Sequence, residues 1–119
     1  MQQTVQTIQM KLNDPWYSLV AKGTKVYEGR RSSDKVLALQ PGDVIVFSHY
    51  IDTSLPEIRV RVIEILRFPT FEDALVALPM NEVLEDGLSI AEGVEIYKKY
   101  VSLGTQVAEG VVMIKIELL

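Results

Sequence analysis

The stretch from Glu57 to Phe68 is the longest strand candidate in the chain. Its first half alternates apolar and basic side chains, in the order Ile58, Arg59, Val60, Arg61 and Val62. This period of two is typical of a half-buried strand, and it breaks at Ile63–Leu66, which indicates a bulge or a barrel corner. Long, strongly twisted strands of this kind close small barrels. We therefore expect a small and strongly curved sheet.

The other segments predict a mixed α+β fold, in which short helices cover the ends of this sheet. Further strands are predicted over 4–12, 25–31, 44–48 and 110–118. The strand 44–48 is continuously apolar, so it belongs in the middle of the sheet. Helices are predicted over 16–22 and 74–78, and a third begins at the capping box of Ser89 and Glu92 and ends near Gly104.

Length and composition exclude several classes of protein. A chain of 119 residues is expected to form one domain, 1–119, with a core of its own. It has no cysteine and one histidine, so we expect no metal site and no cofactor. No apolar run is long enough to cross a membrane, and the first residues do not resemble a signal peptide. We expect a cytoplasmic or nuclear protein.

Charge is unevenly distributed along the chain. The net charge of −4 argues against a protein that coats nucleic acid by bulk electrostatics. However, five basic residues against two acidic ones lie between Lys22 and Lys35, and seven acidic residues with no basic one lie between Phe68 and Tyr97. A local basic patch can therefore attract phosphate. The acidic residues form either solvated helix faces or a docking surface for a basic protein partner.

The basic patch includes the segment Gly23–Arg31, which holds the candidate site. Gly23 follows a short apolar-periodic run and is expected to end a helix in the left-handed conformation. In the strand that follows, Glu28 and Arg30 share one face, while Lys25 and Tyr27 share the other. Two opposite charges on one face form either a solvated ion pair or part of a binding site.

Four motifs in register resemble the ASCH domain family. They are Gly-Thr-Lys-Val-Tyr-Glu-Gly-Arg at 23–30, Pro-Gly-Asp before an apolar strand at 41–43, Ser-Ile-Ala-Glu-Gly at 89–93, and Gly-Val-Val at 110–112. The resemblance covers nearly the whole chain. It implies a small PUA-like mixed β-barrel, a cleft beside the first helix lined by the 23–30 motif, and RNA binding.

Some small bacterial members of this family are amidohydrolases that act on N4-acylated cytidines. Their catalytic set is a lysine, a threonine three residues later and a downstream glutamate, and the resemblance indicates where to look for these residues here. Lys25 matches the lysine, and Glu28 occupies the threonine position. Glu85 is the nearest candidate for the downstream glutamate. Thr24 is another candidate for the missing threonine, on the strand face opposite Lys25.

Three functional hypotheses follow, in order of preference. The first is a module that binds RNA, a nucleotide or a nucleoside, in which Lys25, Arg30 and Arg31 contact phosphate. In that module Glu28 accepts hydrogen bonds from a base or ribose, and Tyr27 or Tyr50 stacks on a base. The second is an amidohydrolase that uses Lys25 and Glu28 on a modified nucleoside. The third is a protein-interaction domain that docks a basic partner on its acidic helices.

Overall fold

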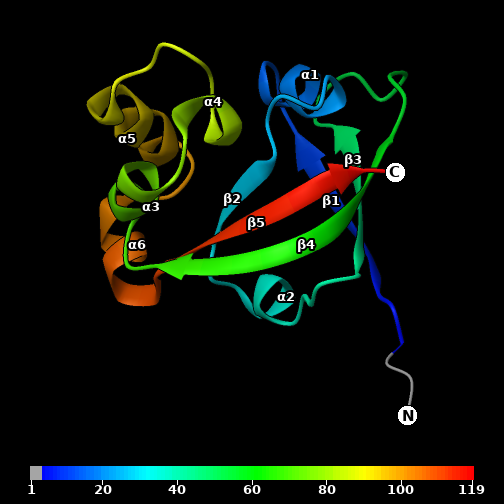
Figure 1. The fold of residues 1–119 in the computed structure, drawn as a ribbon, viewed down its shortest axis with the longest axis horizontal. Helices are drawn as coiled ribbons and strands as arrows, with labels where there is room; N and C mark the ends of the chain where they lie inside the picture. Colours follow the sequence, from blue (N-terminus) through cyan, green and yellow to red (C-terminus); the bar gives the residue numbers. More distant parts are fainter. Residues whose placement is uncertain (1–3) are drawn as a thin grey trace.

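A computed structural model describes residues 4–119 and has the expected mixed α+β fold (Figure 1). Five strands form one sheet in the order β1-β3-β4-β5-β2. Their bounds are β1 Thr7–Leu12, β2 Tyr27–Arg31, β3 Val44–His49, β4 Ile58–Phe68 and β5 Val111–Leu118. β1 runs parallel to β3, and the other neighbours are antiparallel. The sheet curls strongly into a half-barrel, so β1 and β2 remain as edge strands.

The long strand β4 contains an irregularity at the place where its sequence pattern breaks. Val62 pairs with Ile116 of β5, whereas Glu64 pairs with Lys115, so Ile63 is an extra residue in β4. Before this bulge, residues 58, 60 and 62 pack inside the half-barrel; after it, Ile65 does so. The bulge therefore shifts the alternation by one residue and bends the strand.

Two apolar cores share strand β5. The inner core fills the half-barrel and takes Val112, Ile114 and Ile116 from β5. The outer core lies on the other face, where Val111 and Met113 pack against helical residues such as Phe71 and Leu75. β5 is thus buried on both faces, which explains why its sequence is almost continuously apolar.

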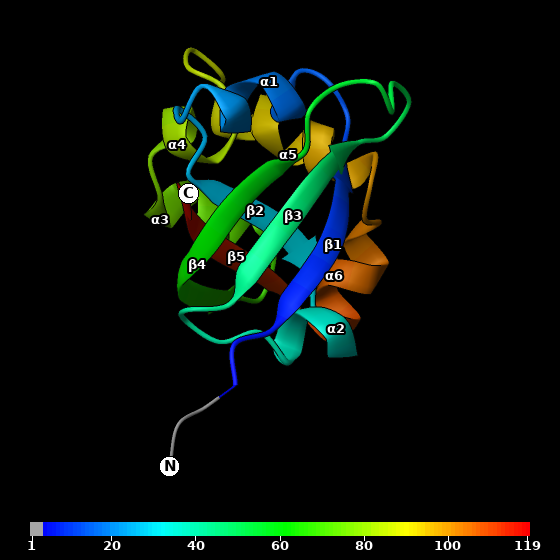
Figure 2. The same cartoon turned by 90° about the vertical axis from the view of Figure 1, so that its right-hand side faces the viewer.

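In the described part of the chain, six short helices surround the sheet. Their bounds are α1 Trp16–Ala21, α2 Asp34–Leu37, α3 Phe71–Ala77, α4 Met80–Val83, α5 Ile90–Lys98 and α6 Leu103–Glu109. α1 and α2 lie at opposite ends of the half-barrel, and α3 to α6 lie together beside β2 and β5 (Figures 1 and 2). The capping box of Ser89 and Glu92 begins α5 as predicted.

Two local predictions about these elements have different outcomes. Gly23 follows α1 with a φ of +81°, so the predicted left-handed glycine is confirmed. The helix predicted to end near Gly104 is wrong in extent, because α5 ends at Lys98 and Gly104 lies in α6. Ser102 caps α6 with a side-chain hydrogen bond to the backbone of Thr105, so a second helix begins where one was expected to end.

Candidate functional site

A cavity of about 520 Å³, here called the cleft, lies between the edge strands and helix α5. One wall is polar and includes Lys11, Lys25, Glu28, Arg30 and Arg31. The facing wall is largely apolar and includes Trp16, Phe71, Leu84, Tyr97, Tyr100 and Val101. The cleft therefore places aromatic side chains opposite a charged surface.

Lys25 lies almost completely buried at the inner end of the polar wall. Only 2% of the residue is exposed. Its Nζ donates hydrogen bonds to the carbonyl oxygens of Tyr27, at 2.5 Å, and Val83, and lies 3.5 Å from Glu28 Oε1. The ring centroid of Trp16 is 5.9 Å away. Two carbonyls, one carboxylate and an aromatic ring therefore surround this ammonium.

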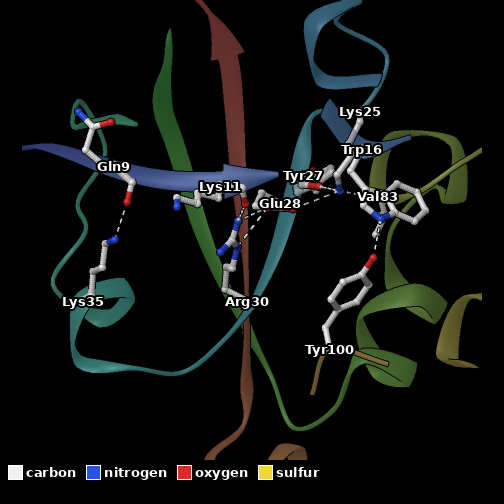
Figure 3. Close-up of polar contacts among 10 residues, drawn as sticks. All are labelled: Gln9, Lys11, Trp16, Lys25, Tyr27, Glu28, Arg30, Lys35, Val83 and Tyr100. Atoms are coloured by element: carbon white, nitrogen blue, oxygen red, sulfur yellow. Dashed lines mark hydrogen bonds and ion pairs between the residues drawn. The ribbon is translucent and has the colours of Figure 1, made fainter. Parts of the chain in front are cut away.

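Glu28 bridges two cations of the polar wall, Lys25 and Arg30. It is 6% exposed, and its Oε2 accepts hydrogen bonds from Arg30 Nε at 3.1 Å and Nη2 at 2.7 Å. The Arg30 Nη2 also donates to the Lys11 carbonyl of β1 at 3.0 Å. Arg30 thus links the two edge strands of the half-barrel through its side chain (Figure 3).

The position of Lys25 differs from the alternation expected from the sequence. The strand begins at Tyr27, so Lys25 precedes it and does not follow its period of two. As a result Lys25 and Glu28, which were expected on opposite faces, form an ion pair. Glu28 and Arg30 are neighbours on one face, as expected.

Burial shifts the pKa of two groups at this site. It lowers the pKa of the Lys25 ammonium below its ordinary value, and the Glu28 carboxylate offsets part of that change. Burial also raises the pKa of the Tyr97 hydroxyl well above its ordinary value, to which the Glu28 charge adds. Tyr97 is therefore a neutral group, whereas the proton on Lys25 is easier to remove than that of an exposed lysine.

Tyr97 packs tightly under the cleft. Its ring stacks on Phe71 with centroids 3.9 Å apart, and its buried hydroxyl has no hydrogen-bond partner among the residues that the structure describes. A Cβ added at Gly29 would lie 2.7 Å from that hydroxyl and 2.9 Å from the Phe71 ring. Gly29 is therefore the residue that lets these aromatic rings approach β2.

The remaining residues proposed from the sequence lie in different places. Arg31 lines the cleft and pairs with Glu109 at 3.1 Å. Tyr27 is buried in the outer core, where Lys115 Nζ lies 5.9 Å from its ring centroid, and it does not line the cleft. Glu85 is exposed just after α4 and does not line it either. Thr24 donates its hydroxyl to the Leu19 carbonyl.

Sequence reasoning missed much of the aromatic wall. Trp16 is half-buried: it packs against both cores and also lines the cleft, where its Nε1 donates a hydrogen bond to the Tyr100 hydroxyl at 3.3 Å. Tyr97 and Tyr100 come from α5 and the turn after it. The one local signal for them is Gly29, a glycine inside a strand, which often marks the close approach of another group.

In the part of the chain that the structure describes, no group of three or more histidine, cysteine or acidic side chains is arranged to hold a metal ion. In residues 4–119, none of the helices has both the length and the apolar character that crossing a membrane requires.

Comparison with known proteins identifies the family. The sequence matches the ASCH domain over residues 10–119. The crystal structure of the hypothetical protein PH0355 has a TM-score of 0.83 and 29% identity, and the match covers 95% of this chain and 99% of that one. The solution NMR structure of protein PF0455 from Pyrococcus furiosus has a TM-score of 0.75 and 30% identity, covering 95% and 97%.

A search of curated proteins gave no match to the sequence. The family assignment depends instead on the domain match and on the two structures, which agree over almost the full length of the chain. The chain therefore belongs to the ASCH domain family, whose PUA-like domains are generally associated with RNA binding.

Proposed function

We propose that residues 1–119 act as one ASCH/PUA-like domain that binds RNA or a nucleotide in the cleft. The observation that carries this proposal is the combination, in one cavity, of a buried carboxylate held by two cations and an aromatic wall. RNA-binding proteins commonly recognise an unstacked base by stacking it on an aromatic ring and by hydrogen-bonding its edge.

The aromatic wall supports the stacking part of this role. Trp16 and Tyr100 are joined by a hydrogen bond and are only partly buried, so a ring can still be covered by a ligand. Tyr50, which the sequence also offered for stacking, is 61% exposed and lines the same cleft. A base stacked here would remove apolar surface from water, which favours binding.

The polar wall supports the recognition part. Glu28 offers carboxylate oxygens that accept hydrogen bonds from a base amino group or a ribose hydroxyl. Arg30 and Arg31 lie beside it and offer guanidinium groups that suit phosphate. Lys25 is too deeply buried for phosphate contact, so its role here is to hold Glu28 in place.

Trp16 is the only tryptophan in the sequence and lines the cleft, so its fluorescence reports binding directly. We expect titration with nucleoside 5′-monophosphates to change that fluorescence. Arg31→Gln should weaken binding about tenfold, as expected for one hydrogen bond to a charged group, because Arg31 lines the cleft and its own ion pair with Glu109 is exposed. Arg59→Gln, on the exposed side of β4, is the matched control and should not.

The same titration followed by NMR locates the site. Shifts confined to β2 and to residues 97–101 would support the cleft. Shifts confined to the acidic helices α3 to α5 with a basic peptide, and none with nucleotides, would reject nucleotide binding and favour a basic protein partner.

Amide hydrolysis of an N4-acylated cytidine is the second candidate, because burial lowers the pKa of Lys25. A lysine with a lowered pKa is more readily neutral, and the neutral amine can act as a general base. Neutral Lys25 would take a proton from water as the water oxygen attacks the acyl carbonyl carbon. The bond between that carbon and N4 would then break as the Lys25 ammonium returns its proton to N4, so that cytidine leaves as the amine and the acyl group as a carboxylic acid. Glu28, 3.5 Å away, would stabilise the resulting ammonium.

To test this candidate, the protein is incubated with N4-acetylcytidine and the cytidine released is measured by chromatography. Lys25→Gln should abolish the release, while Lys22→Gln, at an exposed lysine near the end of α1, should not change it. If the unmodified protein binds the compound but releases no cytidine, hydrolysis is rejected and binding stands.

A further inference from the structure

A second cavity lies along the gap between the edge strands β1 and β2. It has a volume of about 470 Å³, and we call it the seam groove. Its polar lining includes Gln9, Lys11, Arg30, Arg31, Ser33 and Lys35. Four of these six side chains are cationic, and none of the lining residues is acidic.

The backbone of β1 positions two of the cations. Lys35 Nζ, on helix α2, donates to the Gln9 carbonyl, and Arg30 Nη2 donates to the Lys11 carbonyl (Figure 3). Both carbonyls belong to the edge of β1 that has no neighbouring strand. The free edge of β1 therefore fixes the positions of Lys35 and Arg30, which form part of a row of positive charge along the open side of the half-barrel.

The charge of this row is only partly neutralised. Arg30 pairs with Glu28, and Arg31 pairs with Glu109. Within 4 Å of the Lys11 and Lys35 ammonium groups there is no carboxylate among the residues that the structure describes. Lys11 instead lies 5.7 Å from the ring centroid of Tyr50. Two exposed cations are thus available to an anionic ligand.

The seam groove is continuous with the cleft. Lys11, Arg30 and Arg31 line both cavities. A nucleotide whose base lies in the cleft would therefore extend its sugar and phosphate toward the seam groove. In a nucleic acid strand, the phosphates of the adjoining nucleotides would follow along the groove.

We propose that the seam groove binds the phosphodiester backbone of a single-stranded RNA whose base occupies the cleft. This inference depends on the proposed function of the cleft. It specifies that the ligand is an oligonucleotide, and not a free nucleoside or nucleotide. A single strand fits because the cations form a row inside a groove, whereas a duplex needs a broad basic face. The protein carries a net negative charge, so its surface outside this groove would repel the phosphates of a duplex.

Fluorescence titration of Trp16 with four kinds of probe tests the proposal. They are RNA hexanucleotides of adenylate, cytidylate or uridylate, the corresponding nucleoside 5′-monophosphates, DNA hexanucleotides of adenylate, cytidylate or thymidylate, and hexaglutamate. At least one RNA hexamer should bind about tenfold or more tightly than its monophosphate, because one further charged hydrogen bond gives that factor. Lys35→Gln should lower the salt slope for that hexamer by about 0.7, the value of one phosphate contact to a single strand.

Lys22→Gln is the matched control, because Lys22 is exposed and lines neither cavity. Equal affinity for a monophosphate and its hexamer would overturn the seam groove and leave nucleotide binding in the cleft intact. Failure of every nucleotide to bind would overturn both. A DNA hexamer that binds as tightly as the RNA hexamer, or hexaglutamate that matches it, would overturn the assignment to RNA.

Discussion

The cleft and the seam groove meet at Arg30, but their charges are in different states. In the cleft Lys25 and Glu28 are buried and bonded to fixed partners, at 2% and 6% exposure. In the seam groove Lys35 is exposed, and the Arg31 side chain is 53% exposed. Salt screens exposed charges strongly and buried charges much less.

This difference separates two tasks. A buried charge network has one geometry, so it can discriminate between ligands by their hydrogen bonds, and removing one partner disturbs the fold. Exposed cations contribute attraction that depends on salt, and removing one leaves the fold intact. Substitutions in the buried network should therefore change stability much more than substitutions of the exposed cations.

Glu28→Gln should produce the largest effect. It leaves the buried Lys25 ammonium without its carboxylate, and removal of one partner of a buried pair costs about 3 kcal/mol or more. Thermal unfolding should show a Tm lower by about 10 °C. The control, Glu64→Gln on the exposed face of β4, and Lys35→Gln in the seam groove should each change stability by less than about 0.5 kcal/mol.

Binding and turnover of the same variant distinguish the functional hypotheses. Where it remains folded, a changed preference among nucleotides supports the binding role of Glu28, because an amide keeps the shape but alters the hydrogen bonds. Loss of N4-acetylcytidine hydrolysis with unchanged affinity supports the enzyme. A lower Tm without change in either assay would leave Glu28 with a structural role only.

Gly29→Ala should destabilise the protein by about 1–3 kcal/mol, the usual cost of overpacking. The added Cβ would lie 2.7 Å from the Tyr97 hydroxyl and 2.9 Å from the Phe71 ring, so the stacked pair must move. Urea unfolding measures the change. Gly104→Ala is the control, because a Cβ there meets no atom within 4 Å. Equal stability of the two variants would contradict the tight packing under the cleft.

Much of the fold could be predicted because it is encoded in local patterns. The period of two in β4 and its break at Ile63 come from neighbouring residues, and so does the glycine that ends α1. The boundary between α5 and α6 was missed for the same local reason. Gly104 resembles a helix end, but the Ser102 cap begins a new helix there.

The candidate site was only partly predictable. Glu28 and Arg30 lie on one strand, so their contact follows from the period of the strand. The burial of Lys25 depends on the carbonyl of Val83 on α4, which is 58 residues away in sequence. The seam groove depends on the open gap between β1 and β2, and no pattern within a single segment records which two strands become edges.

Lys25→Met should change how stability depends on pH. Burial lowers the pKa of Lys25 in the folded protein, so between that pKa and the ordinary value of about 10.4 the unfolded chain binds more protons. The free energy of unfolding of the unmodified protein should therefore rise with pH relative to the Met variant, by at most about 1.4 kcal/mol per pH unit. Urea unfolding between pH 6 and 10 measures it. A constant difference would mean that the pKa of Lys25 is not lowered.

The smallest expected change in stability is that of Tyr97→Phe, and its sign is opposite. The Tyr97 hydroxyl is buried without a partner in the described structure, and burying an unsatisfied polar group costs about 1–3 kcal/mol. Phe keeps the stack on Phe71 and removes that cost, so the free energy of unfolding should increase by about 1 kcal/mol and the Tm should rise. Because burial raises the pKa of Tyr97, the hydroxyl stays protonated and can donate a hydrogen bond. If the protein retains this destabilising hydroxyl for its ligand, the stabilised variant should bind nucleotides more weakly.

Tyr100→Phe is the control. The Tyr100 hydroxyl already accepts the Trp16 hydrogen bond, so its loss should lower stability slightly. A Tyr97→Phe protein that is less stable would show that the hydroxyl has a partner in solution, and one that is more stable with unchanged affinity would remove Tyr97 from ligand recognition.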